Sequence, residues 1–386
     1  MTIHGRYEIP ALMKTAHRIY FQNSKNMAVI PASSIDLVVT SPPYPMIKMW
    51  DDMFSDKNRN IAKALDKNDG LQAFELMHRE LDPVWKEIYR ILVDGGIACI
   101  NIGDATRTIG GDFKLYPNHS RILAAITAAG LSTLPAILWR KPTNSPNKFM
   151  GSGMLPAGAY VTLEHEYILI LRKGPKREFK NESVKQHRRE SAFFWEERNA
   201  WFSDIWLDLI GAAQRQAATN TRLRTAAFPF ELPYRLINMF STKDGRVVDP
   251  FLGTGTTMAA AMATGRNCIG FEIDPGFQDQ ILSIAETIVE SANHHINQRV
   301  HNHIDFIDRR SDENYQFKHV NKHYELAVMT RQEVDLFFNP LKSAERIDEH
   351  AMEVTYTATP DNNFSGNRKK LIPPRTKKTS TQVNLF

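Results

Sequence analysis

The sequence predicts an α/β protein whose core is a wound, mostly parallel sheet. Short apolar runs rich in β-branched residues alternate with longer segments of helical periodicity, which is the pattern of strand–helix–strand units. A glycine-rich loop at residues 249–257 joins one such run to a helix of small residues. The 386 residues are 42% hydrophobic, so the chain can bury a large core, and wholly disordered or collagen-like architectures are excluded.

The first half of the chain contains the clearest strands. Ile35–Thr40 is apolar and β-branched and stops at a Ser-Pro-Pro-Tyr loop, as a buried parallel strand does before a turn. Helical periodicity predicts helices at residues 71–92 and 119–129, and Gly95 and Gly96 follow the first of them. The other predicted strands span residues 18–21, 97–102, 132–139 and 165–171, with a Pro- and Asn-rich loop at residues 141–154.

The α/β pattern stops at residues 172–218, which are first basic and then aromatic, and it resumes afterwards. The resumed pattern predicts, in order, a helix at residues 230–240, a strand at Arg246–Asp249, a helix at 257–264 capped by Gly265, a strand at 267–273 and a helix at 278–293. Residues 294–358 carry only a weak pattern. Residues 359–386 are rich in Asn, Pro, Lys and Thr and predict a flexible basic tail.

Charge and cysteine content narrow the class of protein. The net charge is +5, but six cations belong to the tail: Arg368, Lys369, Lys370, Arg375, Lys377 and Lys378. A second basic cluster lies within residues 172–189, where a solvated loop and a polyanion site are both open readings. Cys99 and Cys268 cannot form a disulfide framework, and no apolar run approaches the ~20 residues that cross a bilayer. With no signal-peptide pattern at its start, we predict a soluble, cytoplasmic protein without membrane contact.

The glycine loop predicts a cofactor site. Gly253 and Gly255 allow a ligand to approach the backbone, and the following helix N-terminus presents free N–H groups to an anion. Glu272 ends the next predicted strand, where a carboxylate can accept hydrogen bonds from a ribose diol. Met258 replaces the third glycine of a dinucleotide fingerprint, so a ligand with a ribose and a carboxylate but no pyrophosphate fits better. S-adenosylmethionine is such a ligand, and the alternative is an ordinary glycine-rich turn.

The Ser-Pro-Pro-Tyr loop predicts a site for an amino group. Pro42 and Pro43 stiffen the loop, so that the Ser41 hydroxyl and the Pro42 carbonyl can accept the two N–H bonds of one amine. Tyr44 offers a flat face on which a base can stack. Such acceptors favour a pyramidal nitrogen and free the lone pair of a nucleobase amine, which is otherwise delocalised. A simple proline-rich turn is the alternative.

Several segments resemble the DNA amino-methyltransferases. Residues 40–54 and 247–274 are similar to that family's catalytic and cofactor motifs, and residues 95–105, 137–147, 164–174 and 228–255 resemble further motifs. The catalytic motif precedes the cofactor motif by about two hundred residues, which is the permuted order of the beta class. The resemblance implies a Rossmann-like, seven-stranded S-adenosylmethionine-dependent methyltransferase fold. Its parts would be a catalytic half (1–171), a target-recognition region (172–218), a cofactor-binding half (219–293), an accessory region (294–358) and the tail (359–386).

The resemblance also implies roles for individual residues. The base-binding residues would be Ser41, Pro42, Pro43 and Tyr44. The cofactor-binding residues would be Asp249, Phe251, Gly253, Gly255 and Thr256, with Glu272 at the ribose and Pro229 and Phe230 beside the methionine part. The DNA-binding residues, assigned because flipping a base out of a duplex requires phosphate contacts, would be Arg172, Lys173, Lys176, Arg177, Arg188 and Arg189. The neighbouring aromatic residues from Phe193 to Trp206 are predicted to form a small core, and residues 294–358 can also contribute to recognition.

The first residue of the catalytic motif indicates the target base. Family members with Ser there mostly methylate N4 of cytosine, and members with Asp or Asn mostly methylate N6 of adenine. Methylation at carbon 5 needs a cysteine nucleophile, and Cys99 and Cys268 both lie inside predicted strands. The favoured function is therefore N4-cytosine methylation of duplex DNA, paired with a cognate restriction endonuclease at the prokaryotic nucleoid. The alternatives are an N6-adenine enzyme, an RNA or protein methyltransferase, and a non-catalytic DNA-binding regulator.

Two further groups of residues have weaker signals. Four histidines lack an accepted ligand spacing, so we predict a solvated helix end and no metal site: His294, His295, His301 and His303. The last five residues resemble the short peptide by which bacterial proteins dock on the sliding clamp, although Val383 and Asn384 depart from its preferred residues: Gln382, Val383, Asn384, Leu385 and Phe386. An unstructured terminus is the alternative.

Overall fold

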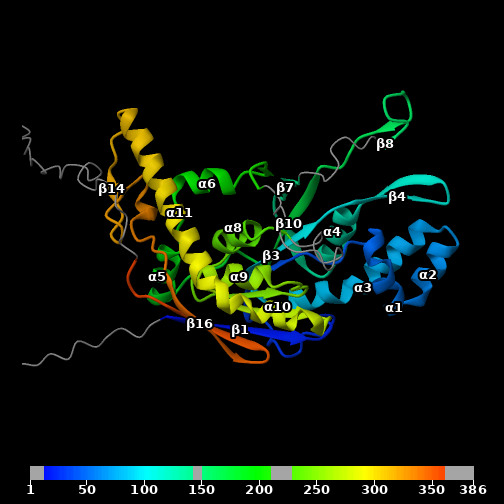
Figure 1. Cartoon of the computed structure of the whole chain (residues 1–386), viewed down its shortest axis with the longest axis horizontal. Coiled ribbons are helices and arrows are strands. Elements are labelled where there is room, and N and C mark those ends of the chain that lie inside the picture. The colour runs from blue at the N-terminus through cyan, green and yellow to red at the C-terminus, as the bar shows by residue number, and fades with distance from the viewer. Residues whose placement is uncertain (1–12, 142–149, 210–227, 361–386) are drawn as a thin grey trace, which may run out of the picture.

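The computed structural model describes residues 13–141, 150–209 and 228–360 and is built around one large sheet (Figure 1). Its strands lie in the order β11-β7-β10-β3-β2-β12-β13-β1-β17-β16, with β6 paired to β10. The middle strands β3, β2, β12, β13 and β1 are all parallel to one another. Their bounds are β1 Lys14–Phe21, β2 Ile35–Thr40, β3 Leu92–Ile102, β12 Arg246–Asp249 and β13 Asn267–Glu272. The predicted α/β class with a parallel-dominated sheet is confirmed.

The central strands are apolar because helices cover both of their faces. In β2, Leu37 and Val39 belong to one core cluster and Val38 belongs to the other. Helices α8 (Glu231–Phe240), α9 (Thr256–Ala263) and the first turns of α11 (Ile284–Asp312) pack on the first face. Helices α3 (Gly70–Ile91) and α4 (Asn118–Ala128) pack on the second face. The smaller helices α1 Asp51–Lys57 and α2 Arg59–Asp66 contact α3.

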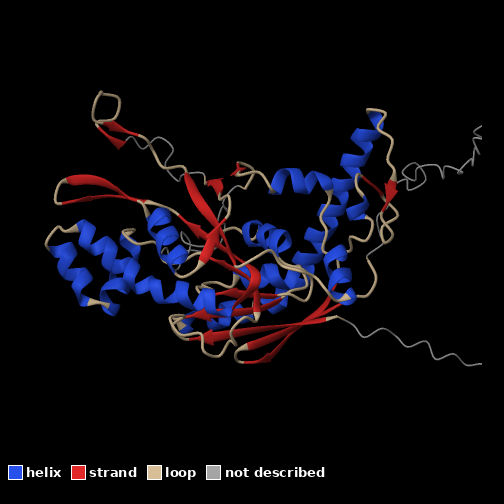
Figure 2. Cartoon of the chain, turned by 180° about the vertical axis from the view of Figure 1, so that it is seen from behind, coloured by secondary structure: helices blue, strands red, loops and turns tan. Residues whose placement is uncertain are grey.

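The sheet continues beyond the parallel strands on the side of β3. Strand β10 (His165–Lys173) is antiparallel to β3, and β7 (Ile137–Arg140) is antiparallel to β10. The strand predicted at residues 132–139 is divided into two short strands, β6 (Leu131–Thr133) and β7. Leu134, Pro135 and Ala136 separate them. Two hairpins extend away from the body at the upper right of Figure 1 and appear in red at the upper left of Figure 2: β4 Ala105–Ile109 with β5 Asp112–Tyr116, and β8 Met150–Gly151 with β9 Ala159–Tyr160.

The region of weak pattern, residues 294–358, is largely structured. The predicted helix 278–293 is divided into α10 (Gln278–Leu282) and α11, and α11 continues to Asp312. The edge hairpin β16 (Leu341–Asp348) and β17 (Ala351–Tyr356) adds to the sheet beside β1. Most of β16 is exposed, so it lacks the apolar alternation by which a buried strand is recognised. A third core cluster joins α11 to the short strand β15 (Ala327–Val328), which pairs with β14 (His319–Val320).

The predicted aromatic core is confirmed in part: three of the six aromatic residues after the basic cluster are buried, whereas Trp195 and Phe202 are 37% and 39% exposed. Phe194, Trp201 and Trp206 are buried, on or beside α6 (Trp195–Trp201) and β11 (Ile205–Trp206). The histidine prediction is wrong for His303, which is fully buried and stacked 3.7 Å from the Phe194 ring. Its imidazole bonds to the Glu196 carboxylate and the Ala327 carbonyl, and α11 continues past it. Within the described ranges, no group of three possible ligands is arranged to hold a metal ion.

Two predictions fall on parts of the chain without a description. Residues 361–386 of the tail, which include its last five residues, lie outside the described residues, and the clamp-binding motif stays a prediction. Residues 142–149 of the Pro- and Asn-rich loop lie outside them as well. Over the described part of the chain, every helix is too short or too polar to span a bilayer.

Candidate active site

The two predicted loops emerge side by side at one edge of the sheet. Strands β2 and β12 are parallel neighbours, with Leu37 opposite Val247 and Val38 opposite Val248. The Ser-Pro-Pro-Tyr loop follows β2 and the glycine loop follows β12, so both leave what we call the carboxyl edge, where β2, β12 and β13 end. This edge is where open α/β sheets place their ligands.

A buried carboxylate joins the two loops. Asp249 Oδ1 accepts a hydrogen bond of 2.6 Å from the Thr40 hydroxyl at the end of β2. Its other oxygen accepts one of 2.6 Å from the Thr257 hydroxyl in the first turn of α9, and the Phe251 N–H donates to Oδ1 at 3.0 Å. Burial raises the pKa of Asp249 to about 6, although these donors favour the charged form. The carboxylate therefore connects the strand end of the catalytic loop to the loop and helix of the cofactor motif.

The glycine loop leaves room for a ligand beside its backbone. Gly253 and Gly255 have φ values of +54° and +87°, in the left-handed region that side chains disfavour. A Cβ at Gly253 would meet nothing within 4 Å, so this position faces open space. A Cβ at Gly255 would lie 2.6 Å from Ile284 Cδ1, because α11 packs closely here. Thr256 begins α9, whose first N–H groups have no side-chain cap.

Glu272 lies at the end of β13, next to the glycine loop. Its carboxylate accepts hydrogen bonds from the backbone N–H groups of Gly253 at 2.8 Å, Ile273 at 2.8 Å and Asp274 at 2.9 Å. Burial raises the pKa of Glu272, and these donors oppose that rise. A carboxylate offers about four acceptor positions, so one remains for a hydroxyl. An open face at Gly253, an uncapped helix start and this acid together fit S-adenosylmethionine.

Pro229 and Phe230 immediately precede α8, which leads into β12. The Phe230 ring lies 5.4 Å from the ring of Tyr234 and 5.5 Å from that of His295. These ring contacts point to α8 and α11 and do not fix a role for either residue at the glycine loop. That they flank the methionine part of the cofactor stays a prediction.

The Ser-Pro-Pro-Tyr loop is held by a polar network. The Ser41 hydroxyl donates to the Tyr44 hydroxyl at 3.1 Å, and Tyr44 donates to Glu166 Oε2 at 2.9 Å. The Asn101 amide donates to both the Tyr44 oxygen (2.9 Å) and Glu166 Oε2 (2.7 Å). Lys141 Nζ donates to Glu166 Oε1 at 2.8 Å. Burial, followed by the Glu166 charge, raises the pKa of Tyr44, so the phenol keeps its proton.

Sequence reasoning assigned no role to three members of this network. Asn101 and Glu166 are 2% and 8% exposed, and Lys141 follows β7. The detectable signal was a polar residue at the carboxyl-edge end of each strand's apolar run, because a buried polar side chain needs partners. Which partners they have depends on β10 lying antiparallel to β3, with Tyr167 opposite Ile102.

The basic cluster lies at the opposite edge of the sheet. Because β10 is antiparallel to β3, its first residues reach the carboxyl edge and Arg172, opposite Ile97, lies near the other end. Arg177 forms an ion pair of 2.5 Å with Asp36 at the start of β2. A strand of six residues separates the two edges by roughly 20 Å. The cluster therefore lies away from the Ser41 loop, and its contact with DNA stays a prediction.

Individual members of the cluster are also less free to contact DNA than their charges imply. Lys173 is buried, and its amine donates to the Leu92 carbonyl at 2.7 Å and to the Ser33 hydroxyl at 3.3 Å. Lys173 is therefore corrected from a DNA contact to a structural donor. Arg189 donates to the Glu182 carboxylate at 2.8 Å. Arg188 stacks over the Phe179 ring at 4.6 Å.

Comparison with known proteins agrees with this geometry. The family described as DNA methylase matches residues 35–283. The type II methyltransferase M.MthZI of Methanothermobacter thermautotrophicus is 51% identical over 345 residues, covering 89% of this chain and 96% of that protein. The type II methyltransferase M.MjaI of Methanocaldococcus jannaschii is 52% identical over 271 residues, covering 67% and 88%.

A solved structure shares the fold and holds the expected cofactor. The putative DNA modification methylase TTHA0409 of Thermus thermophilus, in complex with S-adenosyl-L-methionine, has a TM-score of 0.55 and 30% identity and covers 70% of this chain and 96% of its own. The family match spans both loops of the carboxyl edge, and the cofactor is the one that the glycine loop and Glu272 fit. The chain therefore belongs to the DNA methylases, as an S-adenosylmethionine-dependent amino-methyltransferase of the beta class.

Proposed function

We propose that this enzyme methylates the exocyclic N4 amine of cytosine in duplex DNA. The observation that carries the proposal is the Thr40–Asp249 hydrogen bond, which holds the Ser41 loop beside the cofactor loop. Ser41 at the first position of the loop favours cytosine over adenine. Either amine could be held by the same two acceptors, so N6 of adenine is the second candidate.

The polar network around Ser41 leaves its oxygen able to accept a hydrogen bond from the target amine. The Ser41 hydroxyl donates a hydrogen bond to the Tyr44 oxygen. The lone pairs of the Ser41 oxygen therefore remain free to accept a hydrogen bond from an amine N–H. The Pro42 carbonyl is the second acceptor. S-adenosylmethionine supplies an electrophilic methyl group when it is bound. The amine nitrogen would take this methyl group as the methyl–sulfur bond breaks, with S-adenosylhomocysteine as the leaving group. The methylated nitrogen is more acidic, and its proton can pass through Ser41 and Tyr44 to the Glu166 carboxylate.

Glu166 is suited to receive that proton. Lys141 and Asn101 both donate to it, so its carboxylate is held in one orientation. The residues of this network position the amine and stabilise charge, and none forms a covalent intermediate.

The target base must leave the duplex to reach this loop, at a cost of a few kcal/mol in unstacking. We place the duplex across the carboxyl edge, where the hairpins β4–β5 and β8–β9 extend from the body (Figure 1). The two hairpins contact each other through the stacked rings of Phe113 and Tyr160, 4.9 Å apart. Arg140, mostly exposed and next to Lys141, forms an ion pair of 3.1 Å with Glu164 at this edge, and we propose that a DNA phosphate competes for it.

The relatives are named type II methyltransferases. From this we propose that the enzyme is the modification partner of a restriction endonuclease, protecting the same DNA site.

The test is methyl transfer from tritiated S-adenosylmethionine to duplex DNA, followed by digestion to nucleosides and mass spectrometry. N4-methylcytosine is the expected product, and N6-methyladenine would replace the proposed base with the second candidate. Ser41→Ala and Tyr44→Ala should lose transfer, whereas Ser34→Ala at the far end of β2 should retain it. Transfer that survives in Ser41→Ala and Tyr44→Ala, or that goes to RNA in preference to duplex DNA, would overturn the proposal.

A further inference from the structure

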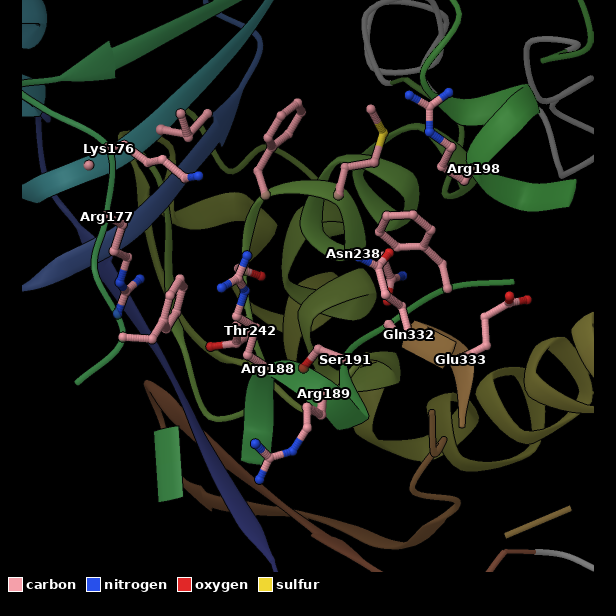
Figure 3. A pocket seen from close by; sticks show the side chains of 18 of the residues that line it. Lys176, Arg177, Arg188, Arg189, Ser191, Arg198, Asn238, Thr242, Gln332 and Glu333 are labelled. Atoms are coloured by element: carbon pink, nitrogen blue, oxygen red, sulfur yellow. The ribbon is translucent and has the colours of Figure 1, made fainter. Parts of the chain in front are cut away.

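A large cavity lies at the edge of the sheet opposite the methyl-transfer site. It has a volume of about 1050 Å³ and is bounded by the start of β3, the end of β10, α5 (Glu182–Glu190), α6 and the end of α8 (Figure 3). Gly95 and Ile97 line it from β3, and Thr242 lines it just before β12. We call it the amino-edge cavity. Its size is at the upper end of the ~300–1,000 Å³ typical of small-molecule sites.

The amino-edge cavity is strongly positive. Among the described residues, seven Lys and Arg side chains line it, against a single carboxylate, that of Glu333. This carboxylate is buried and already accepts hydrogen bonds from Thr330 N–H (2.7 Å), the Thr330 hydroxyl (2.8 Å) and Trp195 N–H (2.9 Å). The Glu333 carboxylate is therefore occupied by these structural hydrogen bonds and does little to neutralise the cations of the cavity.

Four of the seven cations have no carboxylate within ion-pair distance among the described residues: Arg172, Lys176, Arg188 and Arg198. The other three are paired with Asp36 or Glu182. Figure 3 shows Lys176 and Arg177 on one wall and Arg198 across the cavity. Like charges gathered around a concave surface raise its potential and concentrate anions there.

The rest of the cavity lining offers apolar and amide contacts. The floor is apolar, from Ile97, Leu134, Phe193, Met239 and Phe240. Amide side chains also face the cavity, and Asn238 uses its nitrogen to bond the Tyr234 carbonyl, which leaves its oxygen as an acceptor. Cations beside an apolar and amide-lined floor match a ligand with phosphate groups and a ring system.

We propose that the amino-edge cavity binds a ligand of nucleotide chemistry, holding its phosphates through Lys176, Arg188 and Arg198. The source is a free nucleotide or a nucleotide of a single strand, because a duplex presents its phosphates on a convex surface. This site is separate from methyl transfer, since the register of β10 on β3 places it at the other edge of the sheet.

The experiment measures binding of two fluorescent probes to the full chain by anisotropy: a labelled adenosine triphosphate and a labelled single-stranded octanucleotide. Saturating S-adenosylhomocysteine is present, so that the adenosine of the first probe cannot occupy the cofactor site. Binding of at least one probe is expected, with affinity falling as salt rises. Lys176→Gln and Arg188→Gln should each weaken it about fivefold or more, as loss of a charge-assisted hydrogen bond does.

Lys180→Gln is the matched control, because Lys180 is 82% exposed by its side chain and does not line the cavity. It removes the same charge a few residues away and should bind the probe like the wild type. Tighter binding of the triphosphate indicates a free nucleotide, and tighter binding of the octanucleotide indicates a strand. Both results support the site.

Three results would overturn the proposal. The first is that neither probe binds. The second is that Lys176→Gln and Arg188→Gln bind the probe as tightly as the control does. The third is that both variants raise the KM for duplex DNA with kcat unchanged. The last result would return the cluster to duplex binding. Probe binding is measured without methyl transfer, so a failure of the proposed methylation would leave this binding result standing.

Discussion

Thr40→Val tests the link between the two loops of the active site. Valine has nearly the volume of threonine and suits a strand, so the change removes the 2.6 Å hydrogen bond to Asp249 without opening a cavity. Thr40 is fully buried, so water does not replace the lost donor. The Asp249 carboxylate then keeps only Thr257 and Phe251 as donors.

The loss in free energy of unfolding caused by Thr40→Val should depend on pH. The folded-state pKa of Asp249 is about 6, above the ordinary value of 3.8, so folding favours the protonated acid and the stability it contributes falls as pH rises from about 4 to 6. At pH 8 the acid is ionised, and loss of a hydrogen bond to a charged group costs about 1.5–3 kcal/mol. At pH 5 it is mostly protonated, and the cost should fall to about 1 kcal/mol.

The assay is urea unfolding at both pH values, with Thr15→Val as the control. Thr15 is also buried in a strand, but its hydroxyl contacts the neutral partners His17 and Tyr356 at 2.8 Å. Burial lowers the pKa of His17 to about 3, so this imidazole stays neutral at both pH values. The control should lose about 1 kcal/mol at either pH. An equal loss at pH 5 and pH 8 in Thr40→Val would refute the assigned role of the Asp249 charge.

Other substitutions test the cofactor loop and the base-binding loop. Gly255→Ala places a Cβ 2.6 Å from Ile284 at a left-handed φ, so it should lower the free energy of unfolding by about 1–3 kcal/mol in urea and weaken cofactor binding by calorimetry. Glu272→Gln should weaken cofactor binding about tenfold and also lower the free energy of unfolding, because its NH2 group cannot accept a backbone N–H; unchanged affinity would argue against its ribose contact. Tyr44→Phe should keep base stacking but cut the path to Glu166, so kcat should fall more than KM rises; Tyr44→Ala should raise KM for DNA as well. Glu166→Gln keeps an acceptor for Asn101 but cannot take up a proton as a carboxylate does, so kcat for methyl transfer should fall with cofactor affinity unchanged.

Local pattern determined the class of fold and the two loops of the site. Ile35–Thr40 and Arg246–Asp249 are apolar runs that end in loops of special residues, and both the strands and the motifs are legible in a short window of sequence. Hydrophobic alternation cannot find an exposed edge strand, which is why Leu341–Asp348 escaped prediction.

Only the tertiary structure decided what lies beside those loops. The direction of β10 relative to β3 brings Glu166 to Tyr44 and carries Arg172 to the far edge, and no local property of residues 165–173 encodes that direction. It also buries Lys173, whose charge in the sequence resembles that of its exposed neighbours. Charge and residue type are local properties, whereas burial, partners and the edge of the sheet that a side chain reaches are set by strand pairing across the whole chain.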